Sequence, residues 1–371
     1  MYVDNQSYSF TKTAWKRLCK KKTALLSLLV ILLALIIAVG CYFIAPDSTP
    51  SGDRQIVEIQ SRKPGFKIQF LKIFKEDFKD DSPFFQRMLY GRRDAYIFLP
   101  VNSYVVKGDK LIVQKFIDDG VEETQEYSII KLTKKSKLTL KQLIVTKTFW
   151  LGTDKFGRDI LSRLLIGTRV SLSVGLIAVV ISLTIGVLLG SLAGYFRGWV
   201  DDIIMWFINV IWSIPTLLLV FAITLALGKG FWQVFVAVGL TMWVSVARLI
   251  RGQILSIREL EYVEAARALG YSDLRIIFRH ILPNVSGPVL VIATSNFATA
   301  IVIEAGLSFL GVGVQAPQPS WGLMIKENYN FIITHNPFLA IAPGIAIMIL
   351  VLAFNLFGNG LRDALDVKSK L

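Results

Sequence analysis

The sequence holds few residues of the kinds that perform chemistry. Charged residues make up only 18% of its 371 positions, and it has two cysteines and two histidines. Two cysteines give no framework of disulfide bonds, and Cys19 and Cys41 show no metal-binding pattern. His280 and His335 are too far apart in the predicted topology to form a metal site. We expect His280 to stabilise the end of a helix and His335 to cap a loop.

Hydrophobic residues, in contrast, make up 53% of the chain, and the mean hydropathy is positive. This composition is wrong for a soluble globule and typical of a membrane protein that crosses the bilayer several times. The net charge of +14 is compatible with nucleic-acid binding. However, the basic residues flank apolar runs, so orientation in the bilayer explains them better.

Six apolar runs are long enough to cross a bilayer core, which needs about 20 residues of helix. They cover residues 23–44, 170–194, 203–227, 231–247, 285–310 and 337–358. The sequence therefore predicts an all-α polytopic membrane protein with a β-rich insert outside the membrane. The predicted parts are a basic cytosolic N-terminus at 1–22, a first transmembrane helix at 23–45, an external insert at 46–149 and a five-helix core at 150–371.

The first run follows a group of lysines and arginines, as a signal peptide does. It is long for a signal peptide, and no clear cleavage motif follows it. We interpret it as a retained anchor. Residues 38–41 loosely resemble a lipoprotein cleavage site, but Ala38 stands where leucine is usual. We therefore favour a plain transmembrane cysteine at Cys41 over lipidation.

Basic residues gather at one end of the predicted bundle. The opposite short loops hold only Lys229 and Lys326. Because positively charged loops stay in the cytosol, both termini are predicted to be cytosolic. Four basic residues between 155 and 169 fall on the outer side, but they belong to a long loop, where this rule is weak. The cytosolic basic residues are Arg197, Arg248, Arg251, Arg258, Arg267, Arg275, Arg279, Arg362, Lys368 and Lys370.

The external insert contains a strong hairpin signal. Apolar runs at 111–117 and 125–132 flank Asp118-Asp119-Gly120, and an Asp-Gly pair between β-rich runs favours a tight turn. Residues 96–99 and 103–106 predict further strands, with a turn at 107–109. No metal cluster or nucleophile stands out in the insert. We interpret it as a docking or packing domain in preference to a catalytic one.

The chain returns from the insert through a segment rich in glycine and charge. Its members are Gly152, Thr153, Asp154, Gly157, Arg158 and Asp159. These residues either form a structural cluster that fixes the loop or touch a passing solute, and we favour the structural role. Apolar residues then recur at helical spacing, which predicts an amphipathic helix at the membrane interface. They are Ile160, Leu161, Leu164 and Leu165.

Between the fourth and fifth runs, residues 253–283 predict two short cytosolic helices joined at a glycine. One apolar stripe follows the spacing i, i+3, i+4 and i+7. Its members are Tyr262, Ala265, Ala266 and Leu269. The two alanines make this stripe shallow, so that a partner can come close. Gly270 can take the left-handed conformation that ends a helix.

The second short helix follows at once. Ser272 or Asp273 can cap its N-terminus. Pro283 is expected to begin the fifth span, where its missing amide donor costs little. The apolar face of this second helix consists of Ile276, Ile277 and Ile281.

These two helices form an elbow that admits two interpretations. It is either an ordinary helical hairpin packed on its own protein or a rigid lever that plugs into another protein. Connections in helical bundles usually have about two to eight residues, and this one is far longer. Both helices also carry charge beside an apolar stripe. We favour the lever.

At this point the sequence resembles a known family. Glu264, Ala265, Ala266, Gly270 and Pro283 match, in order and spacing, the coupling loop of ATP-binding-cassette importer permeases. The segments 152–159, 304–311 and 319–322 resemble the oligopeptide, dipeptide and nickel branch, specifically its C-type permease subunit. The resemblance covers residues 12–45 and 150–371.

The resemblance implies a type I importer permease fold with six transmembrane helices in a bacterial inner membrane. It implies half of a translocation pathway, with a homologous second permease as the other half. It also implies two cytosolic ATPases that bind ATP and Mg²⁺, an external binding protein that delivers peptide, and no cofactor on this chain. The residues it assigns to ATPase coupling are Tyr262, Glu264, Ala265, Ala266, Arg267, Gly270, Ile277, His280 and Pro283.

Two departures from the branch affect what the resemblance implies. The branch usually has an arginine and an aspartate in the third span, where this chain has Trp206 and Asn209 ahead of Ser213-Ile214-Pro215. The external insert is also longer than usual. An isolated carboxylate in an apolar run is costly, so Glu304 should face the protein interior or water. There it either makes a structural hydrogen bond or meets the ammonium terminus of a peptide. Asn209, Pro215 and Glu304 are thus candidates for the pathway.

The rival interpretations are an integral membrane enzyme and a receptor or signalling scaffold without transport. No convergent Ser/His/Asp set or paired carboxylates favour an enzyme. Residues 227–230 superficially suggest a phosphate loop, but they lack its first glycine and its Ser/Thr, so we expect ATP hydrolysis in partner subunits. Within transport, nickel, glycosides and peptide-like antibiotics remain alternatives to peptides.

Overall fold

The chain forms two compact units in the computed structural model, which describes residues 10–76, 78, 83–136, 138–228, 230–333 and 336–365. A helical unit combines Met1–Leu35, Ser171–Gln315 and Ile347–Leu371, and a second unit combines Ile36–Val170 and Ala316–Ala346. Four residues considered above lie outside the described residues, namely Lys229, His335, Lys368 and Lys370.

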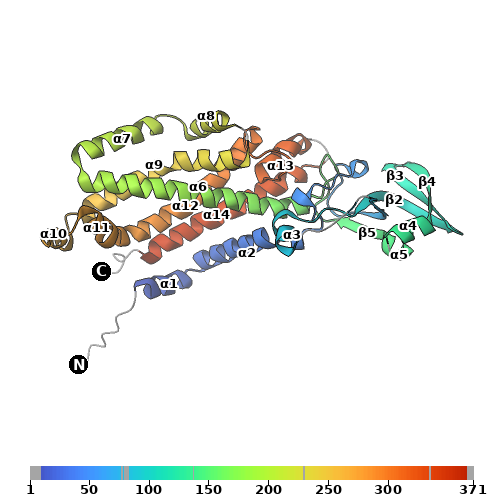
Figure 1. Ribbon diagram of the computed structural model, residues 1–371, viewed down its shortest axis with the longest axis horizontal. Coiled ribbons are helices and arrows are strands. Elements are labelled where there is room, and N and C mark those ends of the chain that lie inside the picture. Colours follow the sequence, from blue (N-terminus) through green and yellow to red (C-terminus); the bar gives the residue numbers. More distant parts are fainter. Residues whose placement is uncertain are drawn as a thin grey trace, which may run out of the picture. The chain divides into compact units, whose positions relative to one another are not determined.

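Within the described residues, five helices are long and apolar enough to cross a membrane. They are α2 (Lys22–Ile44), α6 (Ile160–Phe196), α9 (Phe231–Ile257), the continuous run Asp273–Phe309, and α14 (Phe338–Leu365) (Figure 1). The run Asp273–Phe309 comprises α11 (Asp273–Ile276), a π-helical turn (Ile277–Ile281) and α12 (Leu282–Phe309). Each overlaps a predicted span. The shorter helices are α1 (Phe10–Lys20), α3 (Phe84–Tyr90), α4 (Ile129–Ser136), α5 (Leu140–Leu143), α10 (Glu261–Ala268) and α13 (Trp321–Asn328), with 3₁₀ turns at Pro50–Gly52, Val57–Ile59 and Tyr329–Ile332.

The predicted third span is not one straight helix. It is broken into α7 (Gly198–Trp212) and α8 (Thr216–Leu227), whose axes differ by 93°. Pro215 between them has no amide N–H to continue the ladder of α7. Its ring also disfavours helical backbone at the preceding residue, Ile214. Up to six spans result if this bent pair counts as one.

The structure also contradicts the predicted interfacial helix. Ile160, Leu161, Leu164 and Leu165 are the first turns of α6, which continues without a break to Phe196. Ile160 is fully buried and the other three are half-buried, as in a packed helix and not one lying on a membrane surface. No proline separates these turns from the span, and Gly167 between them lies within the helix and lacks a positive φ, so nothing ends the helix there.

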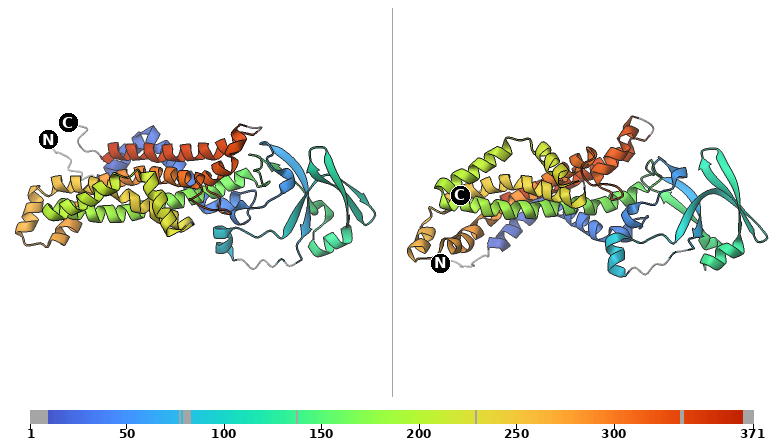
Figure 2. Two further views of the ribbon diagram at one scale, coloured as in Figure 1. Left: turned by 90° about the horizontal axis from the view of Figure 1, so that it is seen from above. Right: turned by 45° about the horizontal axis from the view of Figure 1, so that its top comes forward.

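The small residues of α6 pack within the helical unit. A methyl group added at Gly186 would lie 2.5 Å from Cβ of Val246, and one at Gly190 would lie 2.5 Å from the carbonyl oxygen of Ala247. Real atoms do not approach so closely, so α6 and α9 meet through these glycines. Among the candidate spans, α9 is also the most buried, at 67% of its apolar window compared with 39% or less for the others. α9 packs against α7, α8 and α12 and is the centre of this unit (Figures 1 and 2).

The second unit contains a five-stranded antiparallel sheet in the order β4-β3-β2-β1-β5. Its strands are β1 (Phe66–Phe74), β2 (Tyr96–Lys107), β3 (Lys110–Asp118), β4 (Val121–Ser128) and β5 (Ile144–Phe149). Tight turns join Lys107 to Lys110 and Asp118 to Val121, which confirms both predicted turns. The two strands predicted at 96–99 and 103–106 are one strand, β2, with an irregularity between Val101 and Ser103.

Both faces of the sheet are covered. Phe70, Phe116 and Ile59 form one core, and Leu71, Leu111 and neighbouring residues form the other beneath α4 and α5. Residues 129–132, predicted to continue a strand, are instead the first turn of α4. This helix supplies Leu132 to the second core, so packing against the sheet decides the conformation of a segment that is apolar enough for either.

Candidate functional site

The elbow presents one apolar side outward and buries the other. Val263 and Ala266 of α10 are 0% and 4% exposed and pack with α9 and the run that begins at Asp273. On the opposite side Tyr262 and Ala265 are exposed, and Leu269 is 72% exposed. Three of the four residues of the predicted stripe therefore face away from the helical unit. Val263, which the stripe did not include, is what fixes the helix to the protein.

Gly270 ends α10 as predicted. Its φ is +73°, and the N–H of Gly270 donates to the carbonyl of Arg267 while the N–H of Tyr271 donates to the carbonyl of Ala266. This pair of bonds is the Schellman arrangement, in which glycine avoids the steric cost of left-handed backbone. Nothing lies within 4 Å of the position where a side chain would begin. The constraint at Gly270 is therefore conformational.

The second helix of the elbow has the predicted buried face, with Ile276, Ile277 and Ile281 each 2% exposed or less. Ser272 has the extended backbone of an N-cap, but its side chain makes no capping hydrogen bond. Asp273 instead accepts a hydrogen bond of 2.6 Å from the hydroxyl of Tyr195 at the end of α6. The predicted position of the helix start is thus right, and the predicted side-chain cap is not formed.

Pro283 does not begin a separate helix. It lies inside the continuous run Asp273–Phe309, directly after the π-helical turn Ile277–Ile281. The N–H of Leu282 donates to the carbonyl of Ile277, five residues back. Such a wide turn makes room where a proline would clash with the preceding helical turn. The second helix of the elbow and the span that follows it consequently form one continuous helix.

Aromatic and amide groups brace the tip of the elbow. The rings of His280 and Tyr271 stack with centroids 5.8 Å apart. Nδ2 of Asn284 donates to the hydroxyl of Tyr262 at 3.0 Å and to the carbonyl of His280 at 2.8 Å. The bond from Asn284 to Tyr262 ties α10 to α12. Glu264 is exposed beside the apolar stripe, while Arg267 lies over the ring of Tyr195 at 5.6 Å.

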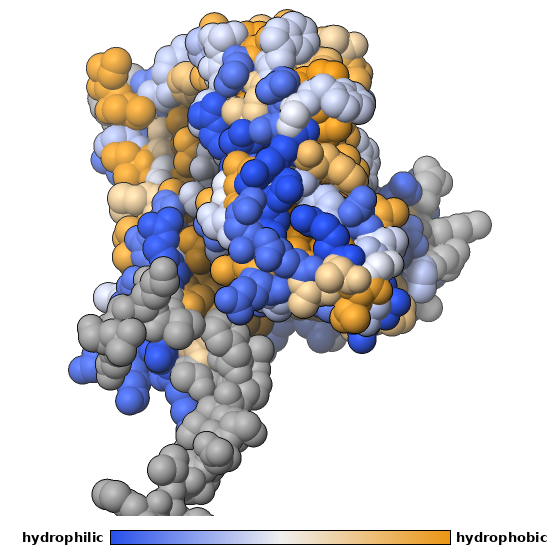
Figure 3. All heavy atoms as spheres, turned by 90° about the vertical axis from the view of Figure 1, so that its left-hand side faces the viewer, coloured by the Kyte–Doolittle hydropathy of each residue, from blue (hydrophilic) through white to orange (hydrophobic). Residues whose placement is uncertain are grey.

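The elbow lies at the end of the helical unit that also holds α1 and the end of α14 (Figure 1). Lys21 and Asp363 form an ion pair there. Figure 3 looks at this end, and it shows hydrophilic residues gathered across the middle with hydrophobic residues to either side. The face combines charge with exposed apolar side chains, as surfaces that bind other proteins do.

The glycine-rich return segment forms a buried ionic cluster in the second unit. Arg158 is 2% exposed in its side chain and pairs with three carboxylates, Asp154 at 2.6 Å, Glu327 at 2.7 Å and Asp53 at 3.1 Å. Arg163 is 1% exposed and lies 3.4 Å from Glu327. Each charge has partners of the opposite sign, which is the condition under which charges persist in a protein interior.

Two glycines allow the backbone to close around this cluster. A methyl group at Gly152 would lie 2.3 Å from the carbonyl oxygen of Arg62, and one at Gly157 would lie 1.8 Å from that of Ile56. Both have positive φ, +81° and +72°. Thr153 and Asp159 form an isolated β-bridge within the loop. The loop can take this shape only with glycine at both positions.

Asp159 and Thr153 connect the loop to its surroundings. The carboxylate of Asp159 accepts from the N–H and hydroxyl of Ser162, and burial raises the pKa of this carboxyl above its ordinary value. The hydroxyl of Thr153 donates to the carbonyl of Ile59. All six residues of the predicted motif are buried, and their polar groups are used within the protein.

The three pathway candidates have separate surroundings. The side-chain oxygen of Asn209 accepts from Arg248 at 3.1 Å, and Arg248 also lies 3.9 Å from the ring centroid of Trp212. Pro215 stands at the bend between α7 and α8. Glu304 is fully buried, and one of its oxygens accepts from the hydroxyl of Ser308, one turn later in α12, at 2.6 Å.

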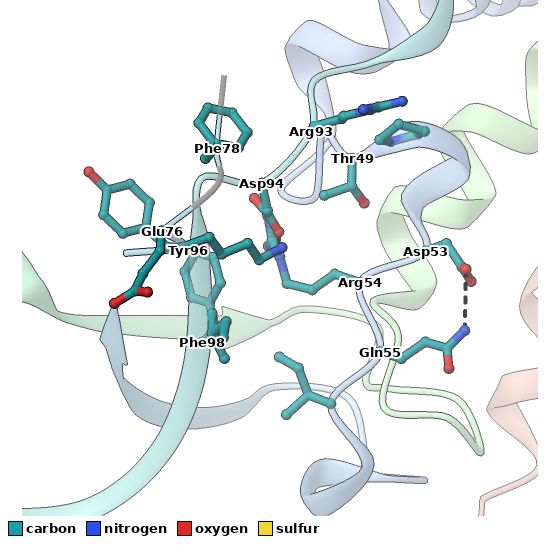
Figure 4. Close-up of a pocket in the computed structure, with 14 residues that line it drawn as sticks. Thr49, Asp53, Arg54, Gln55, Glu76, Phe78, Arg93, Asp94, Tyr96 and Phe98 are labelled. Atoms are coloured by element: carbon teal, nitrogen blue, oxygen red, sulfur yellow. Dashed lines mark hydrogen bonds and ion pairs between the residues drawn. The ribbon is translucent and has the colours of Figure 1, made fainter. Parts of the chain in front are cut away.

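A cleft of about 810 Å³ lies in the second unit beside β2. Arg54 extends along it to Asp94, with an N–O distance of 2.7 Å (Figure 4). Asp53 and Gln55 bond to each other at its edge. Nearby, burial lowers the pKa of Lys147 to about 8, and its ammonium lies 4.1 Å from the ring centroid of Phe98. Within the described residues no group of His, Cys, Asp and Glu has the geometry of a metal site.

Comparison with known proteins identifies the family. Residues 186–370 match the family of binding-protein-dependent transport system inner membrane components, and residues 9–63 match the N-terminal TM domain of oligopeptide transport permease C. The glutathione transport system permease protein of Pectobacterium atrosepticum is 46% identical over 221 residues, which are 60% of this chain and 73% of that protein. The chain belongs to the binding-protein-dependent transport permeases.

Two further relatives agree. The dipeptide transport system permease protein of Alkalihalophilus pseudofirmus is 44% identical over 221 residues, covering 60% of this chain and 72% of that protein. The oligopeptide transport system permease protein of Bacillus subtilis is 42% identical over 223 residues, covering 60% and 73%.

As a member of this family, the chain is a multi-pass membrane protein and a permease subunit of an ATP-binding-cassette importer. Such a permease works with ATPases and substrate-binding proteins, and ATP hydrolysis lies in the ATPase subunits. The matched residues 9–63 and 186–370 leave the sheet outside both family models.

Proposed function

We propose that this permease carries peptides across a bacterial inner membrane and receives mechanical work through the elbow at residues 253–283. The relatives named for glutathione, dipeptides and oligopeptides support a peptide solute. Both termini and the elbow are cytosolic in this proposal, and the insert is external. Partners are a homologous second permease, two ATPases that bind ATP and Mg²⁺, and an external binding protein. The chain itself holds no cofactor.

The observation that carries the proposal is the exposed stripe of α10. Leu269 and Tyr262 are exposed on one side of α10, and the other side of α10 packs on the protein through Val263 and Ala266. Covering a leucine side chain contributes about 1.5–3 kcal/mol, so this stripe favours a partner with a complementary groove. The exposed carboxylate of Glu264 provides a charge beside it for orientation.

The way the elbow joins the spans suggests how work enters. Because α10 is tied to the run Asp273–Phe309 through Asn284 and the stacked rings of Tyr271 and His280, a push on the tip moves α12 as well. Closure of the ATPases on ATP would favour the arrangement of spans in which the elbows are closest together. The return segment 152–159 has a structural role in this scheme.

A pair of charge insertions tests the docking step. Leu269→Glu adds a carboxylate to the stripe, and Ser256→Glu adds the same charge at an exposed position of α9 outside it. Leu269→Glu should reduce recovery of the ATPases with the purified permease by at least about tenfold, from the lost burial of leucine. Ser256→Glu should leave recovery unchanged. Equal recovery of the ATPases with both variants would contradict docking at α10.

A transport assay tests the solute. The complete complex in proteoliposomes, supplied with its binding protein and internal ATP, should accumulate labelled di- or oligopeptide or glutathione. Accumulation of nickel ions and of no peptide would show that the solute is nickel and not a peptide. ATP hydrolysis that responds to the loaded binding protein with no accumulation of any solute would favour a receptor.

A further inference from the structure

A small polar cavity lies inside the helical unit at the bend between α7 and α8. Its volume is about 220 Å³, room for several water molecules. α7 and α8 form one wall, α9 contributes Thr241, Met242 and Ser245, and α12 contributes Asn296 and Thr299. No side chain that lines it carries a charge. Polar side chains make up five of the ten lining residues, and the other five are apolar. The neutral polar groups call for an occupant that forms hydrogen bonds.

Asn296 is the unusual member of this lining. Its side chain is 6% exposed, and its Nδ2 is buried without a hydrogen-bond partner among the described residues. A buried donor left unsatisfied costs about 1–3 kcal/mol. Such groups persist in proteins where something outside the chain completes them. Asn296 lines the cavity, and a turn of its amide about χ2, a torsion with broad minima, brings Nδ2 within reach of an occupant.

The hydroxyl groups of the lining are complementary to Asn296. The hydroxyls of Thr241, Ser245 and Thr299 each donate to a backbone carbonyl of their own helix, at 2.9, 2.9 and 3.0 Å. Their protons are therefore used, and their oxygens remain as acceptors. The cavity thus offers donors from Nδ2 of Asn296 and acceptors from the hydroxyl oxygens.

We propose that this cavity binds a peptide group of the transported solute. Nδ2 of Asn296 donates to the carbonyl oxygen of the peptide bond, and a hydroxyl oxygen of the lining accepts from its N–H. Recognition of this kind reads the backbone and tolerates different side chains. This inference rests on peptide import and assigns a contact site within it.

The test compares two solutes in the complete reconstituted complex. The probes are trialanine and a trialanine in which both peptide nitrogens are methylated, each at a concentration that saturates the binding protein. The methylated probe keeps the carbonyl groups and lacks the peptide N–H groups. The wild-type complex should import trialanine about fivefold faster per ATP hydrolysed, since one hydrogen bond contributes about 1 kcal/mol.

Variants then assign the peptide contact to the cavity. Asn296→Leu keeps the volume and removes the donor to the solute carbonyl, so trialanine import per ATP should fall about fivefold. Ser295→Ala changes the neighbouring, exposed residue, which does not line the cavity, and should behave as wild type. Assembly of the complex and ATP hydrolysis stimulated by the binding protein should stay normal in both.

The outcomes separate this inference from the proposed function. Normal trialanine import in Asn296→Leu would overturn the cavity as a solute site. Failure of Asn296→Leu to assemble would transfer the test to Thr299→Val, which keeps the shape and removes one acceptor oxygen. Unchanged import and preference in Thr299→Val would then overturn the inference in favour of a packing role. Absence of peptide import in the wild-type complex would contradict the proposed function itself.

Discussion

Replacing Asp154 with asparagine should open the return segment locally. Oδ2 of Asp154 lies 2.6 Å from Nε of Arg158, while Oδ1 accepts from the backbone N–H groups of Phe156 at 2.9 Å and Arg158 at 3.0 Å. Asparagine can keep the two backbone bonds through its oxygen. Its Nδ2 would then face the N–H of Arg158, so two donors would meet in a site that is 1% exposed.

The magnitude follows from the remaining partners. Removing one member of a buried ion pair usually costs about 3–5 kcal/mol. Glu327 and Asp53 still pair with Arg158, which places Asp154→Asn near the lower end, about 3 kcal/mol. The opening equilibrium of residues 152–160 should therefore rise about a hundredfold.

Asp119→Asn is the matched control, because it also removes one carboxylate from an arginine. Asp119 is 79% exposed where it pairs with Arg62. Exposed pairs contribute less than about 1 kcal/mol, so this change should alter local opening by at most about fivefold.

Hydrogen exchange measured by mass spectrometry on the complete complex in lipid reports the opening of each segment. Protection of residues 152–160 should fall in Asp154→Asn and stay near wild type in Asp119→Asn. If the two variants lost the same protection in their own segments, the reasoning from burial and pairing would be refuted.

Three further predictions concern single residues. Gly157→Ala should destabilise the second unit far more than Gly120→Ala, as measured by thermal unfolding midpoints. Alanine in left-handed backbone costs about 1–2 kcal/mol at either position. Only at Gly157 would the added methyl group also collide with a backbone carbonyl. Competitive acylation should show Lys147 titrating near pH 8 and Lys110, whose pKa is raised by Glu126, well above it. Since the folded state binds fewer protons at Lys147, stability should rise from about pH 8 towards the ordinary lysine pKa; parallel titration of both lysines would contradict the burial argument. Gly270→Val should strain the end of α10 by about 1–2 kcal/mol and lower ATPase recovery, whereas unchanged recovery would show that this cap does not position the elbow.

Much of the helical unit could be predicted because its signals are local. An apolar run of sufficient length must form a helix in lipid, where every backbone group needs a partner within its own segment. Gly270 is similarly informative, because a glycine after an amphipathic stretch marks the end of a helix whatever surrounds it. The two hairpin turns at residues 107–110 and 118–121 were predictable for the same reason.

The candidate site could be predicted only in part. The motif residues of the elbow and the return segment were found from spacing and resemblance. The roles of individual side chains were not, because Val263 and Leu269 are both apolar and only packing shows that the first is buried and the second exposed. Asn296 had even less signal, since a single asparagine in an apolar run does not reveal whether its amide has a partner.

Local signals were enough to predict a chain that crosses a membrane repeatedly, carries hairpins and ends a helix at Gly270. Long-range packing was needed to show that α7 and α8 diverge by 93°, that α6 extends back to Ile160, and that residues 129–132 are helical. The two kinds of feature depend on interactions of different range. Hydrophobic length and turn chemistry act on neighbours along the chain, whereas bends, helix extensions and cavities depend on which distant side chains compete for the same space.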